Sequence, residues 1–224
     1  EVEDRCLASM GIYVFKASAM MDALEGNATD FGKEIIPSLV NSKNLKCHVF
    51  DDYWEDIGTV RAFFEANLQL TDDKPSFDFY DEKLPIYNYP DILPTAKLVE
   101  CSLKNTMVAS GCRIGNSSFE RCMLGIRSEV GDNCHFSNVV MMGADYQDDD
   151  GSNDQQISIG VGDGSKIQDA IIDKNARIGE NVRLSPKGVQ EGWADERQNI
   201  YSRDGVLVIV KNAFVESGTK IGEI

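Results

Sequence analysis

The chain has 224 residues and a formal net charge of −15, and its hydrophobic and charged fractions are ordinary for a folded globular protein. This charge argues against sequence-independent binding of nucleic acid, which depends on contacts from Lys and Arg to phosphates. It argues equally against docking on an anionic membrane surface. The sequence has no apolar run of the length that a bilayer-spanning helix requires, so we expect no membrane span.

The cysteine and histidine residues do not form a recognisable metal site. The six cysteines are scattered and include no C-x-x-C pair, and the only two histidines, His48 and His135, do not have zinc-ligand spacing. We therefore expect reduced thiols that are mostly packed in the interior.

Residues 1–70 alternate between strand-like and helix-like patterns, which is typical of an α/β domain. Two short apolar runs, at residues 11–15 and 46–50, predict strands, and the residues between them carry helical spacing with Asp30 as an N-cap. Pro37 falls inside the second helical pattern and predicts a kink or restart. Further along, Thr59 is placed to cap a helix that begins at the next residue.

Four of the six prolines then cluster between residues 75 and 94, among several aromatic residues. This composition predicts an extended linker over residues 71–96, lying against a surface, and places the domain boundary there.

Beyond the linker, the rhythm of the sequence changes to aliphatic residues that recur every six positions, separated by Gly and Asn. This hexapeptide period predicts a parallel β-helix over residues 97–224, whose stacked coils bury one continuous core. The predicted inward residues are Val108, Ile114, Val130, Phe136, Val161, Ile167, Ile172, Ile178, Leu184, Ile209, Val215 and Ile221.

Two stretches interrupt the repeat. Residues 143–156 (GADYQDDDGSNDQQ) form an acidic loop, which does not place ligands at the first and last positions of a calcium loop. A second excursion surrounds Trp193. The segment GVGDGSK, residues 160–166, imitates a phosphate loop but lacks its spacing and falls on the hexapeptide register, so we interpret it as coil turns.

Taken in order, several motifs resemble glucose-1-phosphate adenylyltransferase (ADP-glucose pyrophosphorylase) of the type found in plants, algae and several bacterial groups. The motifs are ASMGIYVF, DFGKEIIP, YWEDIGTVRAFFEANL, the proline-rich linker, GADY and AIIDKNARIGENV, and the resemblance covers essentially the whole chain.

The resemblance implies an α/β nucleotidyltransferase domain, of which residues 1–70 are the C-terminal part, followed by a left-handed parallel β-helix of hexapeptide repeats. It implies synthesis of ADP-glucose and pyrophosphate from ATP and glucose 1-phosphate, with Mg²⁺ as cofactor, for starch or glycogen biosynthesis. It also implies allosteric regulation by phosphate-bearing metabolites and a homo- or heterotetramer. The location would be cytoplasmic in a bacterium and the plastid stroma in a plant or alga.

One departure from the family is large. No segment resembles the Gly-rich nucleotide loop, the first metal-binding Asp or the Glu-Lys pair for glucose 1-phosphate. We therefore expect the chain to be a C-terminal portion that is inactive alone.

Asp56 is the candidate catalytic and metal-binding residue. By resemblance it is a carboxylate that binds Mg²⁺, and its position ahead of a glycine suits a ligand site at the edge of an α/β sheet. The alternative is that it only assists the helix start after Thr59 through its charge. Asp51, Asp52 and Glu55 are weaker candidates.

The resemblance assigns substrate contacts to Ser9, whose hydroxyl can donate to a phosphate oxygen, and to Gly11, which permits close backbone approach. Trp54 is a candidate wall of the sugar site. Each also has an ordinary structural interpretation, as a strand-start hydroxyl, a packing glycine or a core aromatic.

Three residues of the predicted β-helix are candidates for effector binding: Asp173, Lys174 and Lys211. An anion site on a chain of charge −15 needs clustered local cations. In the linker, the family often has Gln-Pro-Arg where this chain has Tyr89-Pro90-Asp91, so we expect an altered effector response.

Two other functions remain open from the sequence. Acyltransferases also use hexapeptide β-helices, and His135 lies in the repeats as a potential base. A regulatory, weakly catalytic subunit of the same complex is the second alternative.

Overall fold

The computed structural model describes residues 7–41, 45–88, 92–148 and 157–224. The chain separates into two compact units, Glu1–Asp52 and Tyr53–Ile224. None of the helices in the described part of the chain is long and apolar enough to cross a bilayer.

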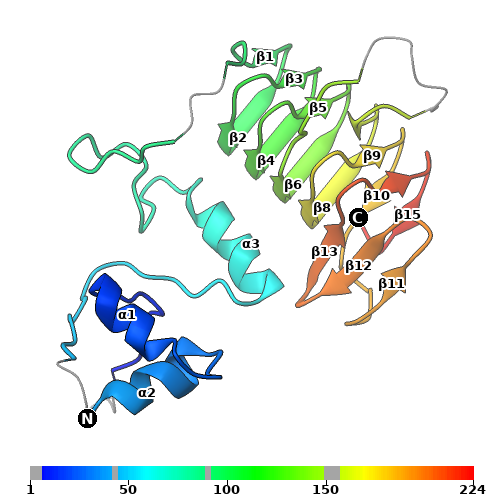
Figure 1. Ribbon diagram of the computed structural model, residues 1–224. Coiled ribbons are helices and arrows are strands. Elements are labelled where there is room, and N and C mark those ends of the chain that lie inside the picture. The colour runs from blue at the N-terminus through cyan, green and yellow to red at the C-terminus, as the bar shows by residue number, and fades with distance from the viewer. Residues whose placement is uncertain (1–6, 42–44, 89–91, 149–156) are drawn as a thin grey trace, which may run out of the picture. The chain divides into compact units, whose positions relative to one another are not determined.

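The first unit consists of short helical segments joined by coil (Figure 1). Helix α1 is Ala17–Ala23, a π-helical turn spans Phe31–Ile35, and α2 is Ile36–Leu39. The Asp30 side chain accepts a hydrogen bond from the Lys33 amide at 2.8 Å, so the predicted N-cap is confirmed. The helix restarts with Pro37 in the first turn of α2, as predicted.

The two strands predicted in this unit are wrong. Residues 11–15 and 46–50 have extended or irregular backbone and pair with no strand among the described residues. A strand needs a neighbour to accept its backbone hydrogen bonds, and here the apolar side chains stay exposed, 97% for Val14 and 52% for Val49.

The second unit begins with helix α3, Val60–Gln69, which Thr59 caps as predicted by accepting from the Ala62 amide at 3.1 Å. Residues 71–96 follow without a helix or strand among those described. The linker aromatics do not lie buried against a surface, contrary to expectation, since Tyr80 and Tyr87 are 81% and 93% exposed. Phe77 packs only against the neighbouring rings of Tyr53 and Phe79.

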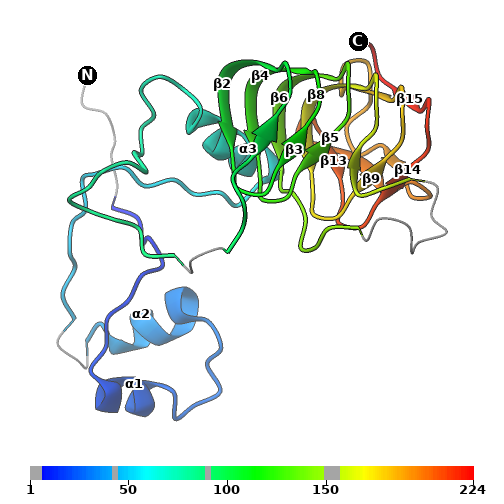
Figure 2. The same cartoon turned by 90° about the horizontal axis from the view of Figure 1, so that it is seen from above.

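The remainder is a parallel β-helix, confirming the hexapeptide prediction (Figures 1 and 2). Fifteen strands are described: β1 Lys97–Leu98, β2 Ser102–Val108, β3 Arg113–Ile114, β4 Ser118–Leu124, β5 Glu129–Val130, β6 His135–Met141, β7 Gly160–Val161, β8 Lys166–Ile172, β9 Arg177–Ile178, β10 Arg183–Leu184, β11 Ala194–Asp195, β12 Ile200–Arg203, β13 Val206–Ile209, β14 Phe214–Val215 and β15 Lys220–Ile221.

Each coil contributes to three faces. One face is the sheet β1-β3-β5-β7-β9-β14. Four longer strands, β2, β4, β6 and β8, each bend at their fourth residue and so contribute to two further faces. Their first halves form the second face together with β10 and β15. Their second halves form the third face, which β13 joins. The bend residues have left-handed φ, 47° at Asn105, 54° at Arg121, 51° at Asn138 and 49° at Asp169. Asn and Asp tolerate this conformation well, whereas Arg121 is an exception.

The core runs through the centre of the coils, and the predicted inward residues line it. All of them are buried except Val108, which is partly buried against the same cluster. The excursion around Trp193 contains β11 and an antiparallel pair, β12 and β13, of which β13 returns to the parallel sheet beside β8.

Helix α3 covers part of the third face. Phe64 and Leu68 are 1% and 0% exposed, and they form a cluster with the outward residues Val140, Ile171 and Val206. The helix is thereby fixed to the β-helix by its apolar side, as its i, i+3, i+4 pattern predicts.

Because Ile178 is 1% exposed in the middle of the core, its truncation leaves a cavity between coils. We expect Ile178→Ala to lower the free energy of unfolding by about 2–5 kcal/mol, and Ile178→Val by about 0.5–1.5 kcal/mol. Urea unfolding monitored by circular dichroism measures both. Ile86→Ala, at a linker position that is 54% exposed, is the matched control and should change stability little. Equal effects at the two positions would contradict the assigned core.

Candidate functional site

Asp56 lies in the coil before α3, and its carboxylate accepts no hydrogen bond from the described first-turn amides of that helix. The first-turn amides are taken by other groups, Ala62 by the Thr59 hydroxyl at 3.1 Å and Arg61 by the Asp204 carboxylate at 3.4 Å. Within the described residues, the exposed Asp56 side chain has no hydrogen bond or ion pair. Asp56 is therefore not a hydrogen-bonding cap, while the alternative that its charge favours the helix start stays open.

The surroundings of Asp56 suit a single protein ligand to Mg²⁺ and not a complete metal cage. The described residues contain no group of three or more His, Cys, Asp or Glu side chains that could hold a metal. Mg²⁺ commonly uses only one or two carboxylates and completes its octahedron with water and phosphate oxygens. Gly58 has no side chain to cover the neighbouring carboxylate, since a Cβ there would stand 3.4 Å from Oδ1 of Asp56. The free carboxylate therefore fits one such ligand.

The predicted substrate residues are exposed and distributed over both units. Ser9 and Gly11 lie in the first unit, where the Ser9 hydroxyl is 3.1 Å from the Tyr13 hydroxyl and accepts from the Gly11 amide at 3.2 Å. Gly11 has φ of +71° with nothing within 4 Å of a Cβ, so backbone conformation and not crowding requires glycine there. Trp54 belongs to the second unit and is 46% exposed, so it is not a core aromatic.

The two candidate effector lysines converge on one carboxylate. The Lys174 ammonium lies 2.8 Å from Oδ1 of Asp145, and the Lys211 ammonium lies 2.7 Å from Oδ2. Asn175 donates to the same Oδ2 from its side-chain amide at 3.2 Å, and its Oδ1 accepts from the Asp145 backbone at 2.8 Å. The Asp145 carboxylate thus lies between the two ammonium groups and pairs with both.

In-register stacking brings these lysines together. Lys174 follows β8 and Lys211 follows β13, and the two strands pair in parallel with Ile172 opposite Ile209. The Asn212 amide then donates to the Lys174 carbonyl at 3.0 Å, so the two corners continue the register beyond the strands. Residues that follow paired strands by the same number of positions therefore lie side by side.

The electrostatics of this cluster favour its charged form. Hydrogen bonds from Lys174 and Lys211 hold the pKa of Asp145 well below its usual range. The same contact raises the pKa of Lys211. Asp173 turns its carboxylate to the Lys174 backbone amide, at 2.6 Å, instead of to either ammonium group. The pKa shifts of Asp145 and Lys211 therefore both favour the ionised forms of these two groups.

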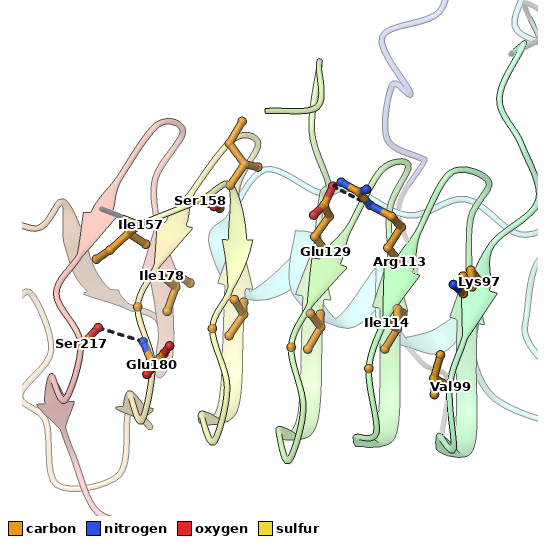
Figure 3. Close-up of a pocket in the computed structure, with 17 residues that line it drawn as sticks. Lys97, Val99, Arg113, Ile114, Glu129, Ile157, Ser158, Ile178, Glu180 and Ser217 are labelled. Carbon is orange, nitrogen blue, oxygen red and sulfur yellow. Dashed lines mark hydrogen bonds and ion pairs between the residues drawn. The ribbon is translucent and has the colours of Figure 1, made fainter. Parts of the chain in front are cut away.

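A hollow of about 490 Å³ lies on the first face of the β-helix (Figure 3). Two of its charged residues, Arg113 and Glu129, form an ion pair, which the dashed line between them marks. Its glycines are required by coil stacking, because a Cβ at Gly131 or Gly179 would collide with atoms of the next coil. The segment at residues 160–166 belongs to these coils and is not a phosphate loop, in agreement with the sequence interpretation.

The linker substitution at Tyr89-Pro90-Asp91 lies outside the described residues, so the proposed change in effector response stays a prediction.

Comparison with known families connects both units to one kind of enzyme. Residues 91–220 match the family described as the GLGC left-handed parallel β-helix domain, and residues 2–73 match the nucleotidyl transferase family. The chain belongs to the GLGC family. A nucleotidyl transferase region followed by this β-helix is the signature of glucose-1-phosphate adenylyltransferase, as the motifs in the sequence indicated, and it makes the β-helix left-handed.

The sequence did not identify Asp145, the residue whose carboxylate pairs with both candidate effector lysines. Asp145 stands in the GADY segment, which the resemblance includes but for which it implies no role. A long acidic stretch follows it, and in such a stretch one carboxylate has no local feature that marks it as a lysine partner. Nor does the strand register mark it, because Met141 pairs with Ile172, so that Asp145 follows its strand by four positions and Lys174 follows its strand by two.

Because Asp145 already holds both lysines, an added oxyanion must displace it. We expect Asp145→Asn to strengthen the binding of inorganic phosphate about two- to tenfold, since asparagine keeps the shape but removes the competing charge. Isothermal titration calorimetry at low ionic strength measures the change.

Asp148→Asn is not a suitable control, because Asp148 holds the largely buried Arg177 at 2.6 Å. Asp72→Asn, at a carboxylate that pairs with Arg121, changes the net charge equally and should leave phosphate binding unaltered. Weaker or unchanged binding in Asp145→Asn would contradict the competition.

Proposed function

We propose that the natural protein containing this chain synthesises ADP-glucose and pyrophosphate from ATP and glucose 1-phosphate, for starch or glycogen biosynthesis. The coarser assignment, a nucleotidyltransferase with a GLGC β-helix, follows from the two family matches. The choice of adenylyl transfer to a glucose phosphate rests on the ordered motifs of the sequence, from ASMGIYVF to AIIDKNARIGENV.

The observation that carries the proposal is the uncommitted carboxylate of Asp56. An exposed carboxylate without a partner in the described part of the chain, at the entrance to a helix that is capped by other groups, is available for a ligand. Attack of a sugar phosphate on the α-phosphate of ATP builds negative charge at the transferring group, and a bound Mg²⁺ offsets such charge. Asp56 would hold this ion and would not itself transfer a proton.

The β-helix contributes regulation in this proposal. Lys174 and Lys211 provide two ammonium groups at one corner, and they already bind a carboxylate there. A phosphate-bearing metabolite, such as activating 3-phosphoglycerate or inhibitory phosphate, offers more charge and more oxygen acceptors than the carboxylate that it replaces.

An acyltransferase that uses His135 as a general base is the weaker alternative. The nucleotidyl transferase match over residues 2–73 favours adenylyl transfer.

We expect Asp56→Asn in the natural protein to lower turnover with ATP and glucose 1-phosphate by about 10²–10³-fold, because the amide cannot supply the charge that a metal needs. Pyrophosphate release measured under saturating substrates tests this. Glu55→Gln, at the neighbouring exposed position, is the matched control and should retain near-parent turnover. Near-normal turnover in Asp56→Asn would remove this residue from the mechanism, and no pyrophosphate release by the parent would remove the proposed reaction.

We expect Lys174→Ala and Lys211→Ala each to raise the half-saturating concentration of 3-phosphoglycerate about tenfold or more, because each removes one charged donor to the anion. Turnover without effector should stay close to that of the parent. Lys187→Ala is the control, since this lysine pairs with Glu223 at 3.5 Å and is well exposed. Unchanged activation in both variants would defeat the effector assignment.

A further inference from the structure

A second group of basic side chains lies on the second face of the β-helix, away from the Lys174 corner. The first residues of β6, β8, β10 and β15 are in register across the sheet, and we call these four residues the basic column: His135, Lys166, Arg183 and Lys220. The residue after each is buried in the core, so the column faces outward. Neighbouring parallel strands lie about 4.8 Å apart, which gives the column a length of roughly 14 Å.

No carboxylate in the described part of the chain pairs with a basic residue of the column, although Glu120, paired with Lys104, lines the adjacent hollow. Within the described residues, Lys166, Arg183 and Lys220 form no ion pair, whereas Lys104 on the same face pairs with Glu120. Two acidic residues at the corner before these strands already accept hydrogen bonds from backbone amides. Asp132 accepts from the Asn116 amide and Asp163 from the Asp132 amide, both at 2.8 Å. Like charges placed opposite each other on adjacent strands repel, so the column is unfavourable until an anion joins it.

A hollow of about 350 Å³ lies at one end of the column. Its walls include the hydroxyl groups of Ser102 and Ser118 and the side chains of His135, Lys166 and Gln168. The Ser118 hydroxyl lies 2.6 Å from Nδ1 of His135, which fixes the plane of the imidazole ring and leaves Nε2 for another partner. The hollow therefore offers neutral and charged donors within the size range of small-molecule sites.

The charge and the length of the column determine which kind of anion it can bind. A long polyanion is disfavoured, because the whole chain, with this patch included, carries a net charge of −15. A single carboxylate can bridge cations beside two neighbouring strands, as Asp145 does, but it is too short to contact all four strands of the column. Two linked phosphoryl groups carry enough charge and oxygen acceptors to contact several of them at once.

We propose that the hollow and the basic column bind the diphosphate group of a small molecule, at a site separate from the Lys174 and Lys211 corner. One phosphoryl group takes donors from Ser118, His135 and Lys166, and the second is placed toward Arg183 and Lys220. The inference goes beyond the proposed function and does not depend on it.

Equilibrium dialysis of the natural protein with radiolabelled inorganic diphosphate at low ionic strength tests this site. The starting protein carries Lys174→Ala and Lys211→Ala, so that the first corner does not contribute. We expect Lys166→Gln combined with Arg183→Gln to remove one equivalent of bound diphosphate, with an affinity loss of at least about tenfold. Lys187→Gln is the matched control and should retain that equivalent.

Further measurements distinguish loss of the binding site from loss of the fold and identify the kind of ligand. Thermal unfolding of the double variant must match that of the parent, and Arg183→Lys, which keeps the charge, should retain most of the binding. Inorganic phosphate should bind about tenfold more weakly than diphosphate, because it cannot reach the far half of the column. Tighter binding of ADP than of free diphosphate would identify a nucleotide as the source, and the reverse would identify the free ion.

Two results would overturn the assignment. The first is an equal number of bound diphosphate equivalents in the parent and in the folded Lys166→Gln, Arg183→Gln variant. The second is equal affinity for phosphate and diphosphate, because the second phosphoryl group would then have no partner on the column.

Discussion

In-register stacking of the coils is the constraint on which the rest of this structure depends. Each inward aliphatic residue, such as Ile167 or Ile178, packs against its equivalents one coil away, and this core is almost fully buried. Because no single coil can bury its own apolar side, the register is set by the whole stack. Outward side chains are then held in columns at the spacing of β-strands, so residues far apart in sequence become neighbours.

This geometry lets a strongly acidic chain build local cationic sites. At one corner, Lys174 and Lys211 converge because their preceding strands pair, and Asp145 neutralises them. On another face, the basic column forms by the same rule but lacks acidic partners among the described residues. A ligand at either place interacts with a few cations at short range, and that short-range attraction outweighs the distant negative charge because salt screens the latter.

Much of the fold could be predicted from the sequence because its determinants are local. The hexapeptide period specified the buried residues of the β-helix, and the Asp30 and Thr59 caps marked where helices begin. Strands at residues 11–15 and 46–50 could not be settled by pattern, since a strand also needs a pairing partner, and none lies beside them among the described residues. Similarly, nothing local to Asp145 or Asp204 announces a partner that is distant in the chain.

The central claim is that coil stacking creates an oxyanion site that Asp145 fills until a ligand replaces it. A crystal structure of the protein with inorganic phosphate tests it most directly. The account predicts phosphate oxygens within hydrogen-bonding distance of both the Lys174 and Lys211 ammonium groups, with the Asp145 carboxylate moved away from them. Phosphate bound elsewhere at saturating concentration, with Asp145 still between the two lysines, would contradict it.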